Sequence, residues 1–573
     1  MKEKETTFFD YYTQKNITTT VPMGSKYDFL LERNAKYMNN IALSFGNRKI
    51  TYEELHERIN EYAKALYHHG IRKGDKIGVC LVNSPESIYV LYALDIIGAV
   101  IVGLSPMNNE YKMRRDIEMT KPSRIITADI LYTNIKNSCD ALHISPILFT
   151  PGESLNNITE NKNNSAKLQD IYYTGKDKDM PKEEYTPNTL SDILFTGGST
   201  GVHKGVELSS NGLNGVVKAV DYVFDLEPGM THLGNIPFGH MVFGRFVMHY
   251  ALCKNLEFAL TLNALPQHFL EEIIRTKSNG AMGGPVHWDN LENNPLLPNS
   301  IPFLTQAITG GEMLKPEKRR EIIKNLQLGG SQAEISDGLG LTEMWAPTHI
   351  GMGKKNTAET IGFAIPFVTD KIVDPKLLEN YVPGTKIDLK EVEPGQNGLL
   401  LVTGPGMMLK YHNNSEETNK VFFYDLDGTK YYCTGDMVTR TGLYNKECKF
   451  SGRQKRNFVC GVDNIYPEQI EKLLTTLPEI KEAIITKIPD SKYQFLPKYH
   501  LCLAKECDLK QLQLKIETLI ESTLGESALP GYIDYTFKPF QRTDNGKLNT
   551  PILQEEDLKQ YQEQKLQLIR KVY

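Results

Sequence analysis

Cysteine patterns that would mark a disulfide-stabilised or zinc-binding protein are missing from this 573-residue sequence. Its eight cysteines are scattered, and the two closest, Cys502 and Cys507, do not have the C-x-x-C spacing of a zinc or redox motif. A strong charge imbalance is missing too, because the formal net charge is only −5. These absences predict a cytosolic protein with reduced thiols. They give no support for nucleic acid or an anionic membrane as a partner.

Long uninterrupted hydrophobic runs are also lacking. The N-terminus, MKEKETTFFDYY, is polar and has no apolar core of the kind that a signal peptide contains. The most apolar stretch runs from Ile88 to Pro106, but Asp95 lies in its middle and Gly98 divides it. A buried helix that leads into a buried strand fits this stretch better than a membrane span. We therefore expect a cytoplasmic protein without a membrane span.

Amphipathic helices alternate with apolar strands in the first part of the chain. Residues 51–70 predict one such helix, with Thr51 and Glu54 as a capping box and Gly70 at its end, and the run KIGVCLV after it predicts a strand. This alternation predicts an α/β fold in which helices wrap largely parallel sheets. Residues 151–190 are rich in Asn, Lys and Asp, which predicts a surface connection.

The composition changes after about residue 452, where a basic turn flanked by glycines leads toward a helix with Pro467 near its start. Apolar runs and a second helix near Leu509–Leu524 follow. A chain of this length is too long for one hydrophobic core. We expect a large N-terminal domain over residues 1–452 and a small α+β domain over residues 453–573.

Residues 195–204, FTGGSTGVHK, contain three glycines, three hydroxyl side chains and a lysine. Glycine has no Cβ, so the backbone can turn sharply and approach a ligand closely. Hydroxyl donors together with the Lys204 ammonium group suit a phosphate. The apolar runs on either side predict two strands that this loop joins.

Other interpretations of the same loop remain at this point. The nucleotide-binding pattern G-x-x-x-x-G-K-[ST] does not match, because Gly205 follows Lys204. The stretch GGSTG matches the G-x-S-x-G elbow of serine hydrolases, with Ser199 as the nucleophile, but that elbow needs a helix directly after the serine. A strand-like run follows here instead. A solvated glycine turn without a ligand is the third alternative.

Segments along the rest of the chain bear on this choice. In order, they are TGGSTGVHKG, NIPFGHMVFG, AITGGEML, DGLGLTEMW, NGLLLVTGPGMMLKYHNN, YYCTGD, GRQKRNFVCGVDNIYPEQIE and QRTDNGKLN. Each resembles a motif of the adenylate-forming superfamily, which includes acyl-CoA synthetases, carrier-loading adenylation domains and beetle luciferases. One such segment is a weak signal, but eight in the same order over nearly the whole chain are a strong one. The motifs are most similar to those of fatty-acyl-CoA and aryl-CoA ligases.

The resemblance implies a two-step reaction. A carboxylic acid first reacts with ATP, in the presence of Mg²⁺, to give an acyl-adenylate and pyrophosphate, and a thiol then displaces AMP. CoA is the expected thiol, and the phosphopantetheine of an acyl carrier protein is the alternative. The segment NIPFGHMVFG has no aspartate to pair with an amino-acid ammonium group, which argues against an amino acid as the substrate. We expect a fatty or related apolar acid, with an aryl acid next. A serine hydrolase at Ser199 and a nucleotide-binding protein without catalysis remain more distant alternatives.

The resemblance also implies roles for individual residues. Lys547 is expected to bridge the substrate carboxylate and the α-phosphate during adenylation, Glu343 to bind Mg²⁺, and Asp436 to accept hydrogen bonds from the ribose hydroxyls. The expected catalytic residues are Lys547, Glu343, Thr342 and His240. The expected nucleotide-binding residues are Thr196, Gly198, Ser199, Thr200, Gly201, Lys204, Gly310, Gly311, Glu312, Asp337, Gly338, Leu339, Asp436 and Arg453.

The remaining implied positions concern the acid, the thiol and domain movement. The expected acyl pocket contains His240, Pro285 and Trp345, and the expected thiol entrance is at Gly461. Lys455 matches a hinge residue about which the small domain rotates between the two half-reactions. Two departures from the family pattern stand out. Leu339 replaces a tyrosine that usually stacks on adenine, and Arg456 replaces a common aspartate.

Overall fold

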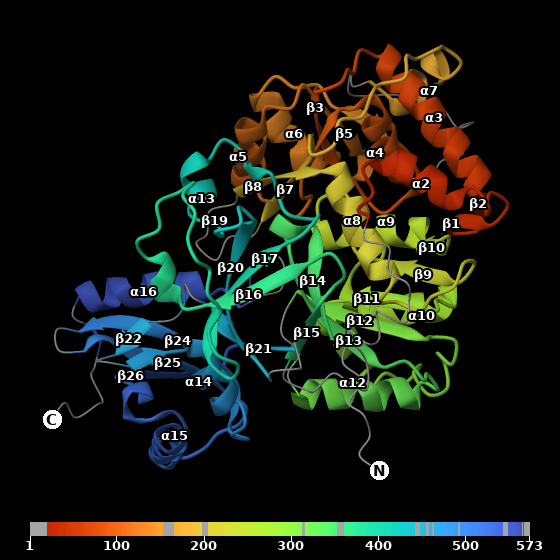
Figure 1. Ribbon diagram of the computed structural model, residues 1–573. Helices are drawn as coiled ribbons and strands as arrows, with labels where there is room; N and C mark the ends of the chain where they lie inside the picture. Colours follow the sequence, from red (N-terminus) through yellow and green to blue (C-terminus); the bar gives the residue numbers. More distant parts are fainter. Residues whose placement is uncertain are drawn as a thin grey trace, which may run out of the picture.

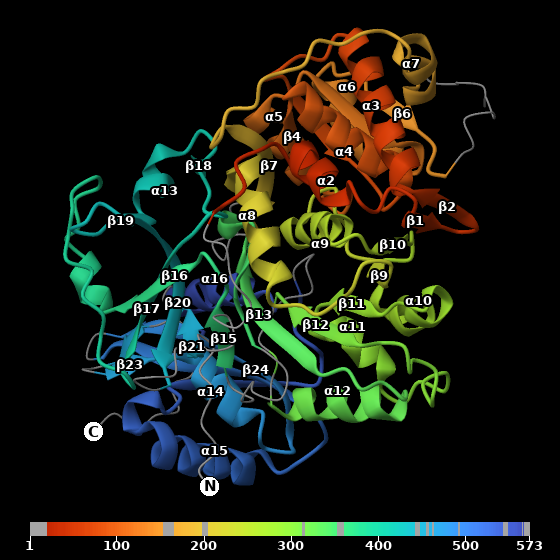
Figure 2. The same cartoon turned by 45° about the vertical axis from the view of Figure 1, so that its right-hand side comes forward.

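The computed structural model describes residues 20–566 except residues 153–165, 197–203, 312, 313, 315, 352–359, 442–446, 454, 455, 457, 461, 462, 491, 492, 543–547 and 564. The described strands form three sheets, with helices around them (Figures 1 and 2). Among the described residues, every helix is too short or too polar to span a lipid bilayer. All eight cysteines are free thiols.

The first sheet lies in the upper part of Figure 1. In spatial order its strands are β18 (Lys410–Tyr411), β8 (Lys204–Ser209), β7 (Leu190–Thr196), β4 (Val100–Gly103), β3 (Lys76–Cys80), β5 (Arg124–Ala128) and β6 (Ile147–Phe149). The strands from β7 to β6 run parallel, whereas β8 and β18 are antiparallel additions at one edge. The helices of this region are α2 (Lys26–Asn34), α3 (Tyr52–His68), α4 (Pro85–Ile97), α5 (Glu110–Thr120), η1 (Asp129–Leu131), α6 (Tyr132–Ala141) and α7 (Leu168–Gly175).

Local sequence signals explain where several of these elements begin and end. The Thr51 hydroxyl accepts a hydrogen bond from the Glu54 N–H at 3.2 Å, so the predicted cap at the start of α3 is confirmed. Helix α4 ends at Gly98, which has φ +76° and leads into β4. Both α4 and β4 are buried, which confirms the predicted buried helix followed by a buried strand.

The prediction of a surface connection over residues 151–190 is wrong for α7. Leu168, Ile171 and Tyr172 form one buried face of this helix, and the Tyr172 hydroxyl bonds to Glu61 of α3 at 2.5 Å. The surrounding Asn, Lys and Asp residues concealed a short amphipathic helix, because its apolar positions span only about one turn.

The second sheet is the largest and occupies the centre and right of Figure 1. In spatial order its strands are β16 (Thr369–Val373), β17 (Asn397–Thr403), β20 (Lys430–Arg440), β21 (Cys448–Arg453), β15 (Thr360–Ala364), β14 (Ala346–Ile350), β13 (Ile335–Leu341), β12 (Gln306–Gly310), β11 (Gly280–Gly283), β9 (Thr231–Gly234), β10 (Glu257–Leu260), β1 (Ile41–Phe45) and β2 (Arg48–Thr51), with β19 (Phe422–Tyr424) beside β20. The strands from β13 to β1 are parallel, and the others pair antiparallel.

Two helices connect the first sheet to the second. Helix α8 (Ser210–Asp221) contacts β7 and β8, helix α9 (Val242–Cys253) contacts β9, β10 and β14, and the two helices contact each other. The other helices of this region are η2 (Pro266–His268), α10 (Phe269–Thr276), α11 (Pro285–Trp288), η3 (Asp289–Leu291), α12 (Pro316–Leu328), η4 (Thr342–Met344), η6 (Pro375–Leu378) and α13 (Ser415–Asn419). The α8–α9 pair therefore packs between the two sheets.

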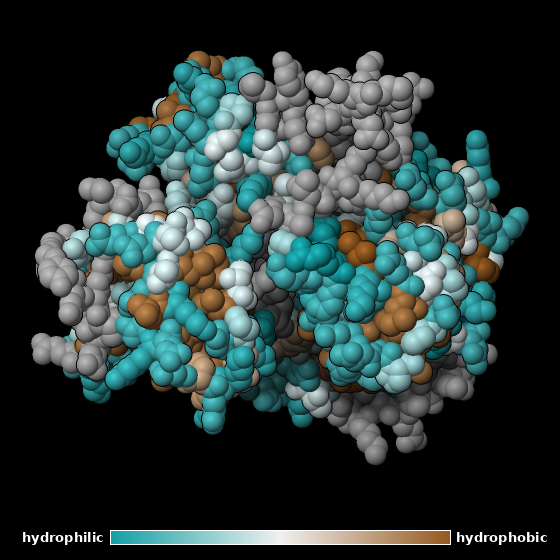
Figure 3. All heavy atoms as spheres, turned by 90° about the horizontal axis from the view of Figure 1, so that it is seen from below, coloured by the Kyte–Doolittle hydropathy of each residue, from teal (hydrophilic) through white to brown (hydrophobic). Residues whose placement is uncertain are grey.

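The C-terminal elements form the third sheet and have a hydrophobic core of their own (blue in Figure 1). The strands are β23 (Asp463–Ile465), β22 (Phe458–Cys460), β25 (Gln494–Leu503), β24 (Ile480–Asp490) and β26 (Tyr532–Thr536). The helices are α14 (Pro467–Leu474), α15 (Leu509–Leu524), η7 (Glu526–Ala528) and α16 (Thr550–Gln562). The predicted helices at Pro467 and Leu509–Leu524 are confirmed. Seen from below, the surface is hollowed between this part and the side that carries α12 (Figure 3).

Candidate active site

The glycine-rich loop connects two antiparallel strands, as its flanking sequence predicts. Thr196 at the end of β7 pairs with Lys204 at the start of β8. Among the described residues, the element that follows the loop is strand β8, which starts at Lys204, and not the helix that the elbow of a serine hydrolase requires. The loop residues Gly198, Ser199, Thr200 and Gly201 lie outside the described residues.

Lys204 has an anionic partner and an aromatic neighbour. Its ammonium group forms an ion pair with Glu417 of α13 and lies 4.6 Å from the centre of the Tyr411 ring. Hydrogen bonds from the Lys204 and Lys420 ammonium groups lower the pKa of Glu417 to about 2. The side chain of Lys204 is only 11% exposed, so its charge acts in a partly desolvated environment.

Tyr411 connects Lys204 to the predicted metal ligand. The Tyr411 hydroxyl donates a hydrogen bond to Glu343 Oε1 at 2.8 Å and lies 3.4 Å from the Tyr432 hydroxyl of β20. Burial raises the pKa of Tyr411, and the Glu343 carboxylate raises it further, so the phenol stays a donor. Three segments that are distant in the sequence therefore meet: the β7–β8 hairpin, η4 with Glu343, and β20.

The backbone around Glu343 is tightly constrained. Glu343 itself is buried, and its carbonyl accepts the Met408 N–H at 2.7 Å. A Cβ at Gly338 would lie 2.5 Å from the His349 carbonyl oxygen, so only glycine fits in β13 at this point. Asp337 forms an ion pair with Arg319 of α12 at 2.6 Å. Thr342 and Leu339 are partly buried on the same turn and strand.

Glycines gather where β11, β12 and β13 end. A Cβ at Gly310 would approach only the Gly338 carbonyl oxygen at 3.9 Å and the Phe243 ring at 4.0 Å. A Cβ at Gly284, next to Pro285 of α11, would lie 3.8 Å from the Gly310 carbonyl oxygen. A Cβ at Gly311 would have no neighbour within 4 Å. A Cβ would therefore make only ordinary contacts at Gly310 and Gly284 and would meet open space at Gly311, as far as the described residues show.

His240 lies on the loop between β9 and α9. Its Nδ1 is buried without a hydrogen-bond partner among the described residues. Burial, assisted by the nearby Arg245 guanidinium, lowers the pKa of His240 to about 4, so the imidazole is neutral near pH 7. An unpaired buried ring nitrogen is costly unless a ligand satisfies it, which supports a place for His240 in a binding site.

Arg245 of α9 holds the His240 loop in place. Its guanidinium donates to the carbonyls of Phe238 and Gly239 at 2.8 and 3.0 Å and to Asp192 of β7 at 2.8 Å. Asp192 also pairs with Lys26 of α2. This buried ionic network ties β7, the His240 loop and α2 together.

Asp436 is fully buried on β20, in register with Arg453 of β21. Thr434 fixes its backbone, because the Thr434 hydroxyl accepts the Asp436 N–H and donates to the Leu400 carbonyl, both at 3.0 Å. The Arg453 side chain is not described. The residues Glu312, Lys455, Gly461 and Lys547 likewise lie outside the described residues.

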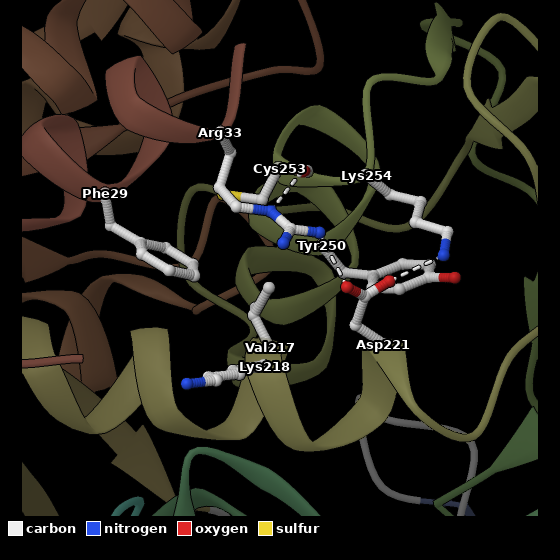
Figure 4. A pocket seen from close by; sticks show the side chains of 8 residues that line it. All are labelled: Phe29, Arg33, Val217, Lys218, Asp221, Tyr250, Cys253 and Lys254. Atoms are coloured by element: carbon white, nitrogen blue, oxygen red, sulfur yellow. Dashed lines mark hydrogen bonds and ion pairs between the residues drawn. The ribbon is translucent and has the colours of Figure 1, made fainter. Parts of the chain in front are cut away.

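Trp345 is enclosed in the N-terminal core, and its indole N–H donates to the Ser209 carbonyl at 2.9 Å. Its place in an acyl pocket stays a prediction. A separate surface pocket lies among α2, α8 and α9, where Asp221 binds both Arg33 and Lys254 at 2.6 Å (Figure 4). None of the predicted site residues lines that pocket.

Sequence reasoning did not single out Tyr411, Glu417 or Arg245. Tyr411 lies inside the quoted segment NGLLLVTGPGMMLKYHNN, but its contact with Lys204 depends on the pairing of β18 with β8. Arg245 lies five residues after His240 in a hydrophobic helix. A lone arginine among apolar residues indicates a buried charge with a partner, and this signal was available in the sequence. Glu417 carries no local signal that distinguishes it from Glu416.

The model of one enzyme family, described as "AMP-binding enzyme", matches residues 30–412. The chain belongs to the AMP-binding enzyme family. It is an adenylate-forming acid–thiol ligase, and ATP and AMP are the nucleotides of its family.

The similarity between this AMP-binding enzyme and its relatives extends over most of the chain. A long-chain-fatty-acid–CoA ligase of Bacillus subtilis (strain 168) is 25% identical over 563 residues, covering 94% of this chain and 95% of the relative. The medium-chain acyl-CoA ligase ACSF2 of Danio rerio is 24% identical, covering 92% of this chain and 87% of the relative. A 4-coumarate–CoA ligase-like protein of Arabidopsis thaliana is 23% identical, covering 86% of this chain and 82% of the relative.

Solved structures resemble this AMP-binding enzyme in fold. ATP-bound MatB from Rhodopseudomonas palustris is 18% identical with a TM-score of 0.77, covering 93% of this chain and 99% of that one. The anthranilate CoA ligase AuaEII in complex with anthranoyl-AMP is 16% identical with a TM-score of 0.76, covering 95% of this chain and 98% of that one. The predicted α/β fold with a large N-terminal part and a smaller C-terminal one is confirmed.

Proposed function

We propose that this enzyme activates a fatty or related apolar carboxylic acid with ATP and transfers the acyl group to the thiol of CoA. The observation that carries the proposal is the meeting of Lys204, Tyr411 and Glu343, in which a cation and a carboxylate contact the same tyrosine, at its ring and at its hydroxyl. A nucleotide polyphosphate needs both, because its charge must be neutralised and its phosphorus atom fixed for attack.

In the adenylation step, an oxygen of the substrate carboxylate attacks the α-phosphorus of ATP. The bond from that phosphorus to the bridging oxygen of the β-phosphate breaks, and pyrophosphate leaves. Lys204 would stabilise the charge of the departing pyrophosphate, and Lys547 would hold the carboxylate against the α-phosphate. Asp436 would accept hydrogen bonds from the ribose, whose two hydroxyls suit one carboxylate. Thr196, Ser199 and Thr200 would donate to phosphate oxygens.

The donor chemistry at Glu343 fits Mg²⁺. This ion prefers hard oxygen ligands, and in nucleotide sites it uses one or two carboxylates together with phosphate oxygens. Glu343 supplies a buried carboxylate that Tyr411 orients through one oxygen. When bound, Mg²⁺ would add positive charge to the phosphates; Tyr411 and the Met408 N–H would keep Glu343 facing them.

In the second step, the thiol sulfur attacks the acyl carbonyl, the carbon–oxygen bond to AMP breaks, and the thiol proton is released. Lys547 and the thiol both need access to this carbonyl, so we place the division between the domains at residue 453 and the pivot at Lys455. The separate hydrophobic core after Phe458 supports this division. Arg456 supports it as well, because its guanidinium bonds to Glu468 of α14 at 3.0 Å and so moves with the C-terminal elements.

Two observations support an apolar acid. The His240 imidazole of the predicted acyl pocket is neutral, and the side chain nearest to a Cβ at Gly310, where β12 ends, is the Phe243 ring. Names of relatives point the same way, since long-chain and medium-chain ligases are among them, while the 4-coumarate and anthranilate ligase names support an aryl acid as the second candidate. Transfer to a carrier-protein phosphopantetheine is the alternative for the acceptor. The free thiols support a cytoplasmic location.

The test is product analysis with a panel of acids. Purified enzyme, ATP and Mg²⁺ are combined with fatty acids of increasing chain length, aryl acids and amino acids, each with CoA or with a holo carrier protein. We expect acyl-CoA and AMP from a contiguous range of apolar acids. Acylated carrier protein without acyl-CoA would identify the alternative acceptor. No AMP from any acid, with folded protein, would contradict the proposal.

A further inference from the structure

The position of Glu417 relative to Lys204 is fixed by two sets of backbone contacts. Strand β18 pairs with β8, which places Tyr411 beside Val206 and brings the chain back past Lys204. Helix α13 then starts at its Asn414 cap, where Asn414 Oδ1 accepts the Glu417 N–H at 3.0 Å. The Glu417 carboxylate therefore reaches Lys204 from a braced helix rather than from a free loop.

The helix itself is tied to the strand that precedes it. The Thr418 hydroxyl accepts the Tyr411 N–H at 3.0 Å and donates to the Asn414 carbonyl at 2.7 Å. Glu417 and Tyr411 consequently approach the Lys204 ammonium as parts of one small unit. Tyr411 contributes a ring face and Glu417 contributes a full negative charge.

Glu417 stands in competition with any phosphate that uses Lys204. The two hydrogen-bonded ammonium groups keep its carboxylate ionised down to about pH 2, because they lower its pKa. A phosphate oxygen placed on Lys204 would lie beside this carboxylate, and like charges at such range repel. Lys204 therefore cannot give its full attraction to both anions at once.

Lys420 offers Glu417 a second partner. Its ammonium group donates to Glu417 Oε1 at 2.9 Å, whereas Lys204 binds Oε2. If Lys204 turns to a phosphate, Glu417 still has a cation to pair with, so the exchange leaves no uncompensated carboxylate. The side chain of Glu417 is 28% exposed, which leaves it room to tilt toward Lys420.

We propose that Glu417 is a placeholder anion, which occupies Lys204 in the empty enzyme and yields it to the nucleotide phosphates when ATP binds. The proposal rests on the proposed function, in which Lys204 binds phosphate. The same exchange runs backwards at product release, where Glu417 competes with pyrophosphate for Lys204. Glu417 thus weakens the binding of ATP and speeds the departure of pyrophosphate.

Thermodynamics gives the sign and size of the effect. The ion pair stabilises only the empty enzyme, so removing it raises nucleotide affinity by the factor that the pair was worth. Partly exposed ion pairs are worth roughly 1.4-fold to fivefold in an equilibrium constant. We therefore expect Glu417→Gln to bind ATP and pyrophosphate more tightly, by up to about fivefold.

The experiment measures the Kd of ATP with Mg²⁺ and of pyrophosphate by calorimetry, in the full-length chain without acid. The variants are Glu417→Gln, Lys204→Ala and the double variant. Glu416→Gln is the matched control, because it removes the same charge from the same helix, from a side chain that is 81% exposed and pairs only with Lys420 among the described residues. We expect tighter binding in Glu417→Gln, little change in Glu416→Gln, and no gain from Glu417→Gln once Lys204 is alanine.

The outcomes distinguish a failure of the phosphate-binding role of Lys204 from a failure of the placeholder role of Glu417. If Lys204→Ala leaves both affinities unchanged, the phosphate-binding role of Lys204 fails, and the placeholder fails with it. If Lys204→Ala weakens binding but Glu417→Gln does not tighten it, or weakens it, the placeholder alone is overturned. Thermal unfolding checks folding, and the ATP-induced rise in Tm should be larger in Glu417→Gln than in the wild type.

Discussion

The His240 side chain is partly buried with its Nδ1 inside the protein, and two carbonyls just before it are held by Arg245. Burial lowers the pKa of His240 to about 4, below the value of about 6.5 in an unfolded chain. The unfolded state therefore binds the proton more readily than the folded state. The stability that neutral His240 contributes is fully present above pH 6.5 and is lost as the pH falls toward 4.

Selective ¹³C labelling of histidine Cε1 measures this state directly, with the His240 resonance assigned by its loss in His240→Gln. We expect no titration of His240 between pH 8 and 5.5. A midpoint near 6.5 for His240 would show that burial does not lower its pKa, and the case for an apolar acid would then lose this support.

Single elements were the most predictable level of this protein. The Thr51 cap, the α15 bounds and the strands around the glycine loop follow from signals within a few residues of each other. Helix α7 was missed because its apolar face spans about one turn in a polar region. Tyr411 could not be placed from local sequence, since its contact with Lys204 requires β18 to pair with a strand about 200 residues earlier.

The network around Arg245 links elements, and it yields a prediction at that scale. Breaking a buried ion pair on one side costs about 3–5 kcal/mol, whereas an exposed pair contributes about 1 kcal/mol or less. Arg245→Met should therefore lower the free energy of unfolding by about 3–5 kcal/mol in urea titrations. Arg275→Met is the control, because Arg275 is 46% exposed and pairs with Glu272 within one helix.

A double variant tests whether the loss comes from the Asp192 carboxylate, which keeps only Lys26 as a cationic partner when Arg245 is replaced. Arg245→Met with Asp192→Asn should lose clearly less stability than the sum of the single variants. The KM for the acid should rise in Arg245→Met, because the His240 loop loses its two carbonyl contacts. A cost no larger than that of Arg275→Met would contradict a structural role for this network.

At the scale of the whole molecule, the proposed domain alternation requires Lys547 in the C-terminal part to serve adenylation more than thiol transfer. Arg456 ties the start of these elements to α14, while Arg453 still belongs to β21 of the large sheet. The proposed change of body lies between residues 453 and 456, at the proposed pivot Lys455. The family motifs predict this place, whereas the contact of Arg456 with Glu468 depends on the fold of α14.

Lys547→Ala tests the domain-alternation account. Losing one strong transition-state donor should slow adenylation by about 10²–10³-fold, measured as acid-dependent formation of acyl-adenylate in single turnovers. Transfer of a supplied acyl-adenylate to CoA should be far less affected. Equal losses in the two half-reactions would contradict the account.

The central claim is that Glu343, oriented by Tyr411 beside Lys204, forms the nucleotide site of an acid-activating enzyme. Acid-dependent exchange of labelled pyrophosphate into ATP measures that step without any thiol. We predict exchange with an apolar acid in the wild type and in Glu379→Gln, a surface control, and a loss of about 10²-fold or more in Glu343→Gln. Exchange that is absent with every acid, or that survives undiminished in Glu343→Gln, would contradict the claim.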